Sequence, residues 1–324
     1  MATARHWSAF HVFLADPERA NDFLLEWLKP RLPTLLSEGR IAGWFFVRYW
    51  EGGPHLRLRL LDADPALCIE FAHALQNAVP AYLSGFSLSA RQYYANHPLD
   101  GEPRPLESLP WYPEGSVVQL PYEPEIRRYG GPAAIAHCEQ LFKRSSEIAL
   151  AVLGATRGDP QRRAAVAWRL MAEAVFAFEA SPSALVAFCA SYAGFWRGYS
   201  AETRALDERL AAQTAPAAQV QALRRMLEEC IDGARADSAQ ARWAEACAGL
   251  DRRFGALHAQ QRLVSPLTGE VCEGEEALRA ARFSILSSQI HMLNNRLGLQ
   301  PAQELALARS LAAAAGAVGE GIAA

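Results

Sequence analysis

The chain has 324 residues, 51% of them hydrophobic, and a formal net charge of -3. This length and composition suffice for a large core in one or two domains. A nearly balanced charge without a basic stripe argues against direct binding to nucleic acid or to an anionic membrane surface. No apolar run reaches about 18 residues and no signal-peptide pattern opens the chain, so we expect a cytoplasmic protein with no membrane partner.

The six cysteines are widely separated and form no C-x-x-C pair. This spacing argues against a zinc site, a redox dithiol or a disulfide framework, and the cysteines are expected to be small buried residues. A Walker loop, a dinucleotide-binding glycine motif after a strand, G-x-S-x-G and H-E-x-x-H are all missing from the sequence. We therefore expect no cofactor and no metal site.

The first hundred residues alternate between strand and helix patterns. The predicted elements are a strand, a helix, two strands joined by a turn, a helix and a last strand, over 7–14, 17–37, 43–50, 55–61, 65–83 and 86–94. Asp16 and Asp64 precede prolines and are expected to cap the two helices, while Pro30 and Pro33 should kink or break the end of the first. This order is the ferredoxin-like βαββαβ pattern.

A proline-rich linker at 97–114 and a short strand at 116–120 are expected next. From Pro132 onward Ala, Leu, Arg and Glu recur at helical spacing. Helices are predicted near 132–154, 160–179, 182–197, 201–234, 237–262, 273–297 and 301–316. The fold class is therefore α+β, with a ferredoxin-like part at 1–115 followed by a mainly helical part at 116–324.

The strand at 55–61 carries the sharpest local pattern. Side chains alternate in direction along a strand, so His55, Arg57 and Arg59 share one face and three leucines share the other. A solvated, half-exposed strand would show the same alternation. The alternative is a cationic surface for carboxylates, because arginine offers a permanent charge and bidentate geometry. Strand periodicity alone does not decide between the two.

A second pattern combines Glu125 and Arg128 with Tyr129, Gly130 and Gly131. Two glycines after a charged pair can bend the chain and bring its backbone close to a ligand. Taken alone, this segment more often forms a surface turn with a local ion pair.

A third pattern lies near the end of the chain, in the segment 287–296. On a helix Ser288, His291 and Asn295 fall on one face, with Ser287 beside them. A single helical histidine is usually a satisfied core residue, but a stripe of hydroxyl, imidazole and carboxamide needs polar partners if it is buried. No second histidine at metal-ligand spacing accompanies it.

Together these segments resemble the C-terminal, glutamate-eliminating domain of class I lantibiotic dehydratases, a family that also includes stand-alone thiopeptide-type bacteriocin biosynthesis proteins. The similar stretches follow one another in order over nearly the whole chain, at 44–49, 53–59, 122–131, 139–142 with 145–146, and 291–296. Each stretch is modest alone, and the set is specific.

The resemblance implies an enzyme that removes glutamate from esterified Ser or Thr of a ribosomally made precursor peptide, leaving dehydroalanine or dehydrobutyrine. The implied catalytic residues are Arg57, Arg59, Glu125, Arg128 and His291. Arginines would clamp the glutamyl carboxylate or stabilise the enolate, and His291 would be the acid or base. Glu125 would either orient an arginine or serve as the base. The arginine strand, the loop at 121–131 and the His291 helix should then converge.

The resemblance implies further binding residues and partners. His55, Tyr129, Ser287, Ser288 and Asn295 are candidates for substrate binding. A separate glutamylating protein would use glutamyl-tRNA, so this chain would need no direct contact with nucleic acid, and a homodimer is left open.

Two other functions compete with glutamate elimination. Some stand-alone relatives build the pyridine of thiopeptides by an aza-[4+2] cycloaddition of two dehydroalanines, with loss of water and the leader peptide. Such an enzyme has no glutamate to clamp, so retention of the full Arg, Glu and His set favours elimination. The third function is a non-catalytic subunit that binds the precursor peptide.

Overall fold

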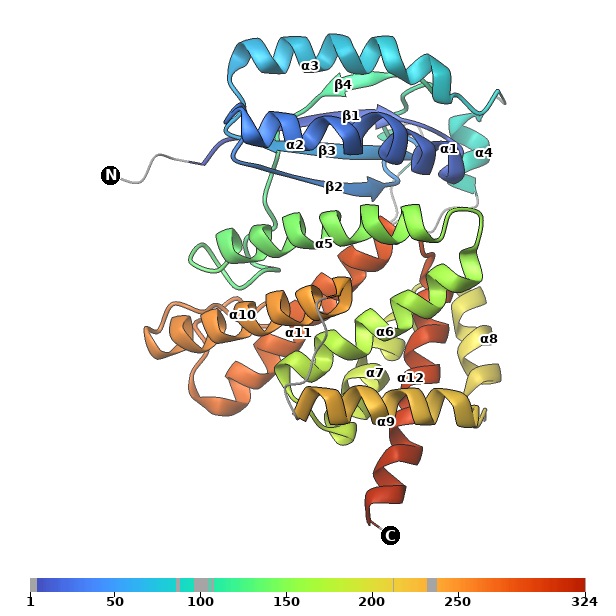
Figure 1. Ribbon diagram of the computed structural model, residues 1–324, viewed down its shortest axis with the longest axis vertical. Coiled ribbons are helices and arrows are strands. Elements are labelled where there is room, and N and C mark those ends of the chain that lie inside the picture. Colours follow the sequence, from blue (N-terminus) through green and yellow to red (C-terminus); the bar gives the residue numbers. More distant parts are fainter. Residues whose placement is uncertain are drawn as a thin grey trace. The chain divides into compact units, whose positions relative to one another are not determined.

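A computed structural model of the chain describes residues 5–85, 88–95, 105, 108–211, 213–231 and 238–323. It divides into two compact units, Met1–Glu123 and Pro124–Ala324. The first unit contains a four-stranded sheet with helices, and the second is built from helices (Figure 1). The α+β class and the mainly helical second part are thus confirmed.

The sheet of the first unit is antiparallel, with strand order β2-β3-β1-β4 (Figure 1). Its strands are β1 (Trp7–Phe13), β2 (Gly43–Tyr49), β3 (His55–Leu61) and β4 (Val117–Gln119). All four observed strands lie where the sequence predicts them: β1 and β2 are rich in aromatic residues, β3 alternates polar and apolar residues after a turn, and β4 falls within the short strand expected at 116–120. The short strand β4 pairs with β1 and belongs to this unit.

The predicted last strand at 86–94 is wrong. Residues 90–95 form helix α4 (Ala90–Ala95), while Phe86 and Ser87 lie outside the described residues. The aromatic residues that suggested a strand are held by tertiary contacts instead, since the Tyr94 hydroxyl accepts from the Gly52 N–H and donates to the Pro110 carbonyl. The four-stranded antiparallel sheet is confirmed, and the ferredoxin-like arrangement of the whole unit stays a prediction.

Two helical segments follow β1 and β3. The first comprises α1 (Pro17–Asp22), a π-helical stretch at Phe23–Leu28 and α2 (Lys29–Ser37), and the second is α3 (Pro65–Ala78) with a 3-10 turn at Val79–Tyr82. Asp16 and Asp64 accept backbone N–H groups as the predicted N-caps. The break expected at Pro30 and Pro33 is not found, because α2 runs through both prolines, and the irregular stretch is the π-helical one that precedes them.

One face of this sheet is the core of the first unit. Leu56, Leu58 and Leu60 are fully buried there. Helix α3 packs on the same face, where the Phe10 and Phe71 rings lie 5.2 Å apart in an edge-on contact. Because side chains alternate along a strand, Arg57 and Arg59 point to the opposite face of the sheet.

The second unit is an array of helices (Figure 1). Their bounds are α5 (Ile135–Ala155), α6 (Pro160–Phe178), α7 (Pro182–Arg197), α8 (Ala201–Leu210), α9 (Ala217–Ile231), α10 (Ala239–Ala259), α11 (Gly274–Leu297) and α12 (Pro301–Ala323). The helix predicted at 201–234 is two helices, because Pro216 interrupts it. Helix α12 continues past its predicted end at 316.

Five of the cysteines are buried and Cys230 is half-buried, as predicted for small core residues. Within the described ranges no single helix has the length and apolar character needed to cross a membrane. Helices α6 and α7 meet that test only as a pair, with a bend of 119° between them.

Candidate functional site

Arg57 lies in a fixed position on the sheet face opposite the buried leucines of β3. Its guanidinium carbon is 3.4 Å from the centroid of the Tyr49 ring, and its Nε–H donates to the His55 Nε2 over 3.1 Å. The His55 Nδ1 in turn bonds to the Gly53 carbonyl at 2.8 Å. The carbonyl defines the histidine tautomer, and that tautomer presents a lone pair to Arg57. Arg57 is therefore pre-oriented rather than freely solvated.

His55 itself is buried and uncharged at neutral pH. Burial lowers the pKa of His55 to about 3, with Arg57 and Arg59 adding to the effect and the Gly53 carbonyl opposing it. His11, whose ring stacks on His55 at 4.9 Å, likewise has a pKa lowered to about 3, mainly by burial. A histidine that stays neutral is a poor clamp for a carboxylate. In this geometry His55 holds Arg57 in place.

Arg59 is held by aromatic rings on the same face. Its guanidinium carbon lies 4.5 Å from the centroid of Tyr122 and 5.1 Å from that of Phe45. Both arginines of the strand thus pack against a tyrosine, which restricts their rotamers.

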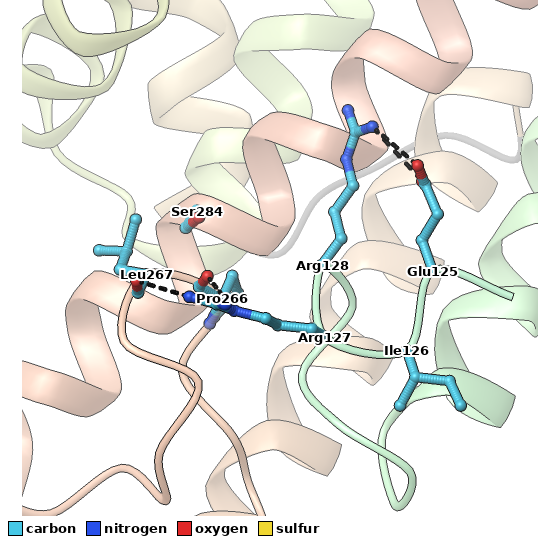
Figure 2. A pocket seen from close by; sticks show the side chains of 7 residues that line it. All are labelled: Glu125, Ile126, Arg127, Arg128, Pro266, Leu267 and Ser284. Carbon is cyan, nitrogen blue, oxygen red and sulfur yellow. Dashed lines mark hydrogen bonds and ion pairs between the residues drawn. The ribbon is translucent and has the colours of Figure 1, made fainter. Parts of the chain in front are cut away.

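The second unit brings the loop before α5 against helix α11. The Arg128 Nε–H donates to the Ser288 hydroxyl over 3.1 Å, and its Nη1 lies 3.4 Å from a Glu125 carboxylate oxygen (Figure 2 draws the pair). The ion pair is partly exposed, so its net contribution to stability is small. The ion pair orients the Arg128 guanidinium. Orienting an arginine is one of the two roles expected for Glu125, and the other is that of the base.

Gly130 and Gly131 serve packing in this loop. Both have φ of +89°, and a Cβ on Gly131 would lie 2.6 Å from the Val264 side chain. A Cβ on Gly130 would meet Ile285 of α11 at 3.0 Å. The glycines therefore dock the loop tightly against its neighbours and set the place of Arg128.

The same loop borders a cavity with a volume of about 510 Å³. Its lining residues are Glu125, Ile126, Arg127, Arg128, Pro266, Leu267 and Ser284 (Figure 2). Arg127 donates to the Pro266 carbonyl over 3.3 Å and to the Leu267 carbonyl over 3.1 Å, which ties the two loops of the cavity together. Exposed Ile126 and Leu267 give it an apolar rim.

His291 is the partly solvent-exposed member of a polar network formed by residues of helices α7, α11 and α12. Its Nδ1 lies 2.9 Å from Oε1 of Glu304, whose carboxylate is fully buried. The Glu304 Oε2 accepts from the Asn294 amide over 3.0 Å and from the Tyr192 hydroxyl. The imidazole also packs on the Trp196 ring, with 5.0 Å between the ring centroids. The side chain remains 24% exposed, so solvent reaches part of the ring.

The remaining candidates have different surroundings. Tyr129 is buried, with its ring edge-on to Phe142, and burial raises the pKa of its hydroxyl. Ser287 and Asn295 are half-buried on α11. Their roles in substrate binding stay predictions.

The predicted residues gather in two groups, one in each unit. His55, Arg57 and Arg59 share a sheet face, whereas Glu125, Arg128 and Ser288 are joined directly, with His291 one turn further along α11. That the two groups converge stays a prediction. Glu304 is not among the residues predicted from the sequence. One signal could have identified it, because it is a glutamate in the first turn of a helix that closely follows the His291 helix.

Comparison with known sequences identifies the family. The family described as lantibiotic biosynthesis dehydratase C-term matches residues 7–315. The chain belongs to this family. Its sequence has no match among curated proteins. The resemblance found in the sequence is therefore confirmed at the level of the family.

Solved structures share the fold of this family member. The pyridine synthase TbtD from thiomuracin biosynthesis aligns with a TM-score of 0.72 at 19% identity, covering 97% of this chain and 99% of that one. TsrL aligns with a TM-score of 0.59 at 18% identity, over 98% and 96% of the two chains. The tRNA-dependent lantibiotic dehydratase MibB from Microbispora sp. 107891 aligns with a TM-score of 0.57 at 20% identity, over all of this chain and 29% of MibB. At these identities the likenesses concern the fold alone.

Proposed function

We propose that this chain is the glutamate-eliminating component of a split, tRNA-dependent peptide dehydratase. It converts glutamylated Ser or Thr of a ribosomally made precursor peptide to dehydroalanine or dehydrobutyrine. Family membership supports the setting, which is peptide antibiotic biosynthesis. We further propose that a separate protein adds the glutamate, that both act in the cytoplasm, and that the first unit keeps the ferredoxin-like arrangement.

The observation that carries the proposal is the contact between Arg128 and Ser288. It holds a guanidinium against helix α11 one turn before His291, so a cation for a leaving carboxylate adjoins an acid or base. The exposed part of His291 and the cavity beside Arg128 leave room for a peptide.

Elimination requires a group that removes the Cα proton, a cation that stabilises the leaving carboxylate, and a cation that binds the glutamyl carboxylate or the enolate oxygen. A base removes the Cα proton of the esterified residue, and the electron pair of that bond forms the Cα=Cβ double bond. The Cβ–O bond breaks, and glutamate leaves as a carboxylate. Arg128 stabilises the leaving charge, an arginine of β3 binds the glutamyl carboxylate or the enolate oxygen, and His291 carries the proton.

A single incubation tests the proposal. Purified protein is mixed with a glutamylated precursor peptide, and the peptide mass is followed with time. Loss of glutamate to give a dehydro residue is the expected result. A peptide that is bound and left unchanged would instead support the non-catalytic subunit.

Cycloaddition remains the second candidate, because this chain and the pyridine synthase TbtD cover each other almost completely. The discriminating substrate is a peptide with two dehydroalanines and an intact leader. Pyridine formation with leader release, together with inertness toward the glutamylated peptide, would replace elimination as the function.

A further inference from the structure

Glu304 is a fully buried carboxylate in the first turn of α12. Burying a carboxylate is costly unless several donors surround it. Asn294, Tyr192 and His291 all point hydrogen-bonding atoms at its two oxygens. The partial positive charge at the start of a helix also favours an anion there.

The two oxygens of Glu304 have different partners. Oε2 is occupied by the Asn294 amide and the Tyr192 hydroxyl. Burial, together with the nearby carboxylate, raises the pKa of Tyr192 well above its ordinary value, so the phenol keeps its proton and donates. Oε1 is hydrogen-bonded to the His291 Nδ1. The His291 Nδ1 therefore carries a proton, and in the neutral ring Nε2 carries the lone pair.

The turn between the helices fixes this pairing. Gly298 adopts φ +80° after α11, and the Leu299 N–H returns to the Asn294 carbonyl at 3.0 Å, which closes the helix. Helix α12 then starts at Pro301 and brings Glu304 opposite His291. The Trp196 ring packs on the imidazole and limits its rotation. Among the described residues, the His291 Nε2 has no hydrogen-bond partner.

We propose that Glu304 is a positioning residue that makes the His291 Nε2 the atom that takes the Cα proton. This inference rests on the proposed elimination. Nε2 accepts the proton as the Cα–H pair becomes the double bond and glutamate departs. The buried carboxylate stabilises the resulting imidazolium without touching the substrate, in the way a buried aspartate supports the histidine of a serine protease.

Glu304→Gln is the decisive variant, because it keeps the shape and removes the charge. The two donors at Oε2 attract the new carbonyl oxygen, which turns the new amide NH₂ toward the His291 Nδ1. An amide donor there favours the tautomer with the proton on Nε2, which cannot accept another. The expected loss of kcat is up to about ten-thousandfold, by analogy with the wrong-tautomer aspartate variant of a serine protease.

The tautomer is measured directly from the ¹⁵N chemical shifts of the His291 ring, at a pH where the ring is neutral. The wild type should show a protonated Nδ1, Glu304→Gln a protonated Nε2, and the exposed α11 control Glu276→Gln the wild-type pattern. A wild-type ring protonated on Nε2 overturns the inference. This readout needs no turnover, so its failure is distinct from a wild type that never removes glutamate.

A double-mutant cycle gives the kinetic counterpart. In a His291→Asn background, Glu304→Gln should change the residual elimination rate less than about twofold, because residues that act as a unit are not additive. An equal loss in both backgrounds would mean that Glu304 only supports the fold, and would overturn the positioning role. Melting curves of all variants show whether each is folded.

Discussion

Arg128 and Ser288 are 160 residues apart in the sequence, and the Arg128 Nε–H donates to the Ser288 hydroxyl over 3.1 Å. The contact joins the loop before α5 to the helix that carries His291. Glu125 holds the other end of the guanidinium. Two partners thus fix a planar cation beside the proposed proton carrier, and this fixed geometry distinguishes Arg128 from an ordinary surface arginine.

Arg128→Lys should lower the kcat of glutamate elimination by about a hundredfold, because lysine keeps the charge but cannot match a carboxylate with two parallel donors. Ser288→Ala should have a smaller effect, about threefold to tenfold, since one orienting hydrogen bond is lost. Initial rates on a glutamylated peptide measure both. The exposed Ser37→Ala in the other unit serves as the matched control. Equal rates for the wild type and Arg128→Lys would contradict the clamp.

Acid should destabilise the first unit through His11 and His55. Their pKa values of about 3 in the folded chain lie below the ordinary 6.5, so the unfolded chain binds more protons between these values. The contribution of the two neutral histidines to stability is therefore constant above pH 6.5 and is lost as the pH falls toward 3. Each histidine contributes a slope of about 1.4 kcal/mol per pH unit in that window.

Urea unfolding at several pH values between 7 and 4 measures this slope. His55→Gln keeps a polar side chain that does not titrate, so its slope should be shallower than that of the wild type by about 1.4 kcal/mol per unit. An unchanged slope would mean that His55 is protonated in the folded chain.

Local patterns in the sequence predicted what depends on local chemistry. The alternation from His55 to Leu61 placed Arg57 and the leucines on opposite faces, because the two-residue period of a strand needs no distant partner. Asp16 and Asp64 were identified as caps for the same reason. The π-helical stretch before Pro30 was not predicted, since its hydrogen bonds depend on how the helix packs.

Features made by distant partners were missed. Tyr94 belongs to a helix because its hydroxyl meets Gly52 and Pro110, and nothing in the local sequence reveals those contacts. In the sequence Glu304 is one of three charged residues on an alanine-rich helix, and only its place in the first turn after the His291 helix sets it apart. Its significance depends on Tyr192, which is 112 residues away. Tertiary contacts of this kind override propensity and determine the polar network.

Gly131→Ala should lower the free energy of unfolding by about 2 kcal/mol or more. The new Cβ would clash with Val264 and would force φ of +89° on a residue that resists it. Gly158→Ala is the matched control, because its φ of +72° is similar but no atom lies within 4 Å of the new Cβ. Urea unfolding should show a clearly larger loss for Gly131→Ala, and similar losses would contradict the docking role.

Arg57→Lys should reduce kcat/KM for elimination by about tenfold to a hundredfold, because lysine loses the planar stacking on Tyr49 and the bond to His55. Tyr49→Leu removes only the platform and should cost about threefold. Arg40→Lys, on an exposed ion pair with Glu70, should leave the rate unchanged. A glutamylated peptide that accumulates with Arg57→Lys is the diagnostic product, and normal turnover would exclude Arg57 from the site.

Arg127 should govern peptide binding rather than chemistry. Its two hydrogen bonds to the Pro266 and Leu267 carbonyls hold the cavity walls together, and the apolar rim suits an aliphatic or aromatic side chain beside the modified residue. Arg127→Ala should raise KM for the peptide about fivefold to tenfold and change kcat less than about twofold, because a preformed cavity lowers the cost of binding. Arg262→Ala removes an exposed arginine near the same loop as a control. A drop in kcat with unchanged KM would place Arg127 in the chemical step instead.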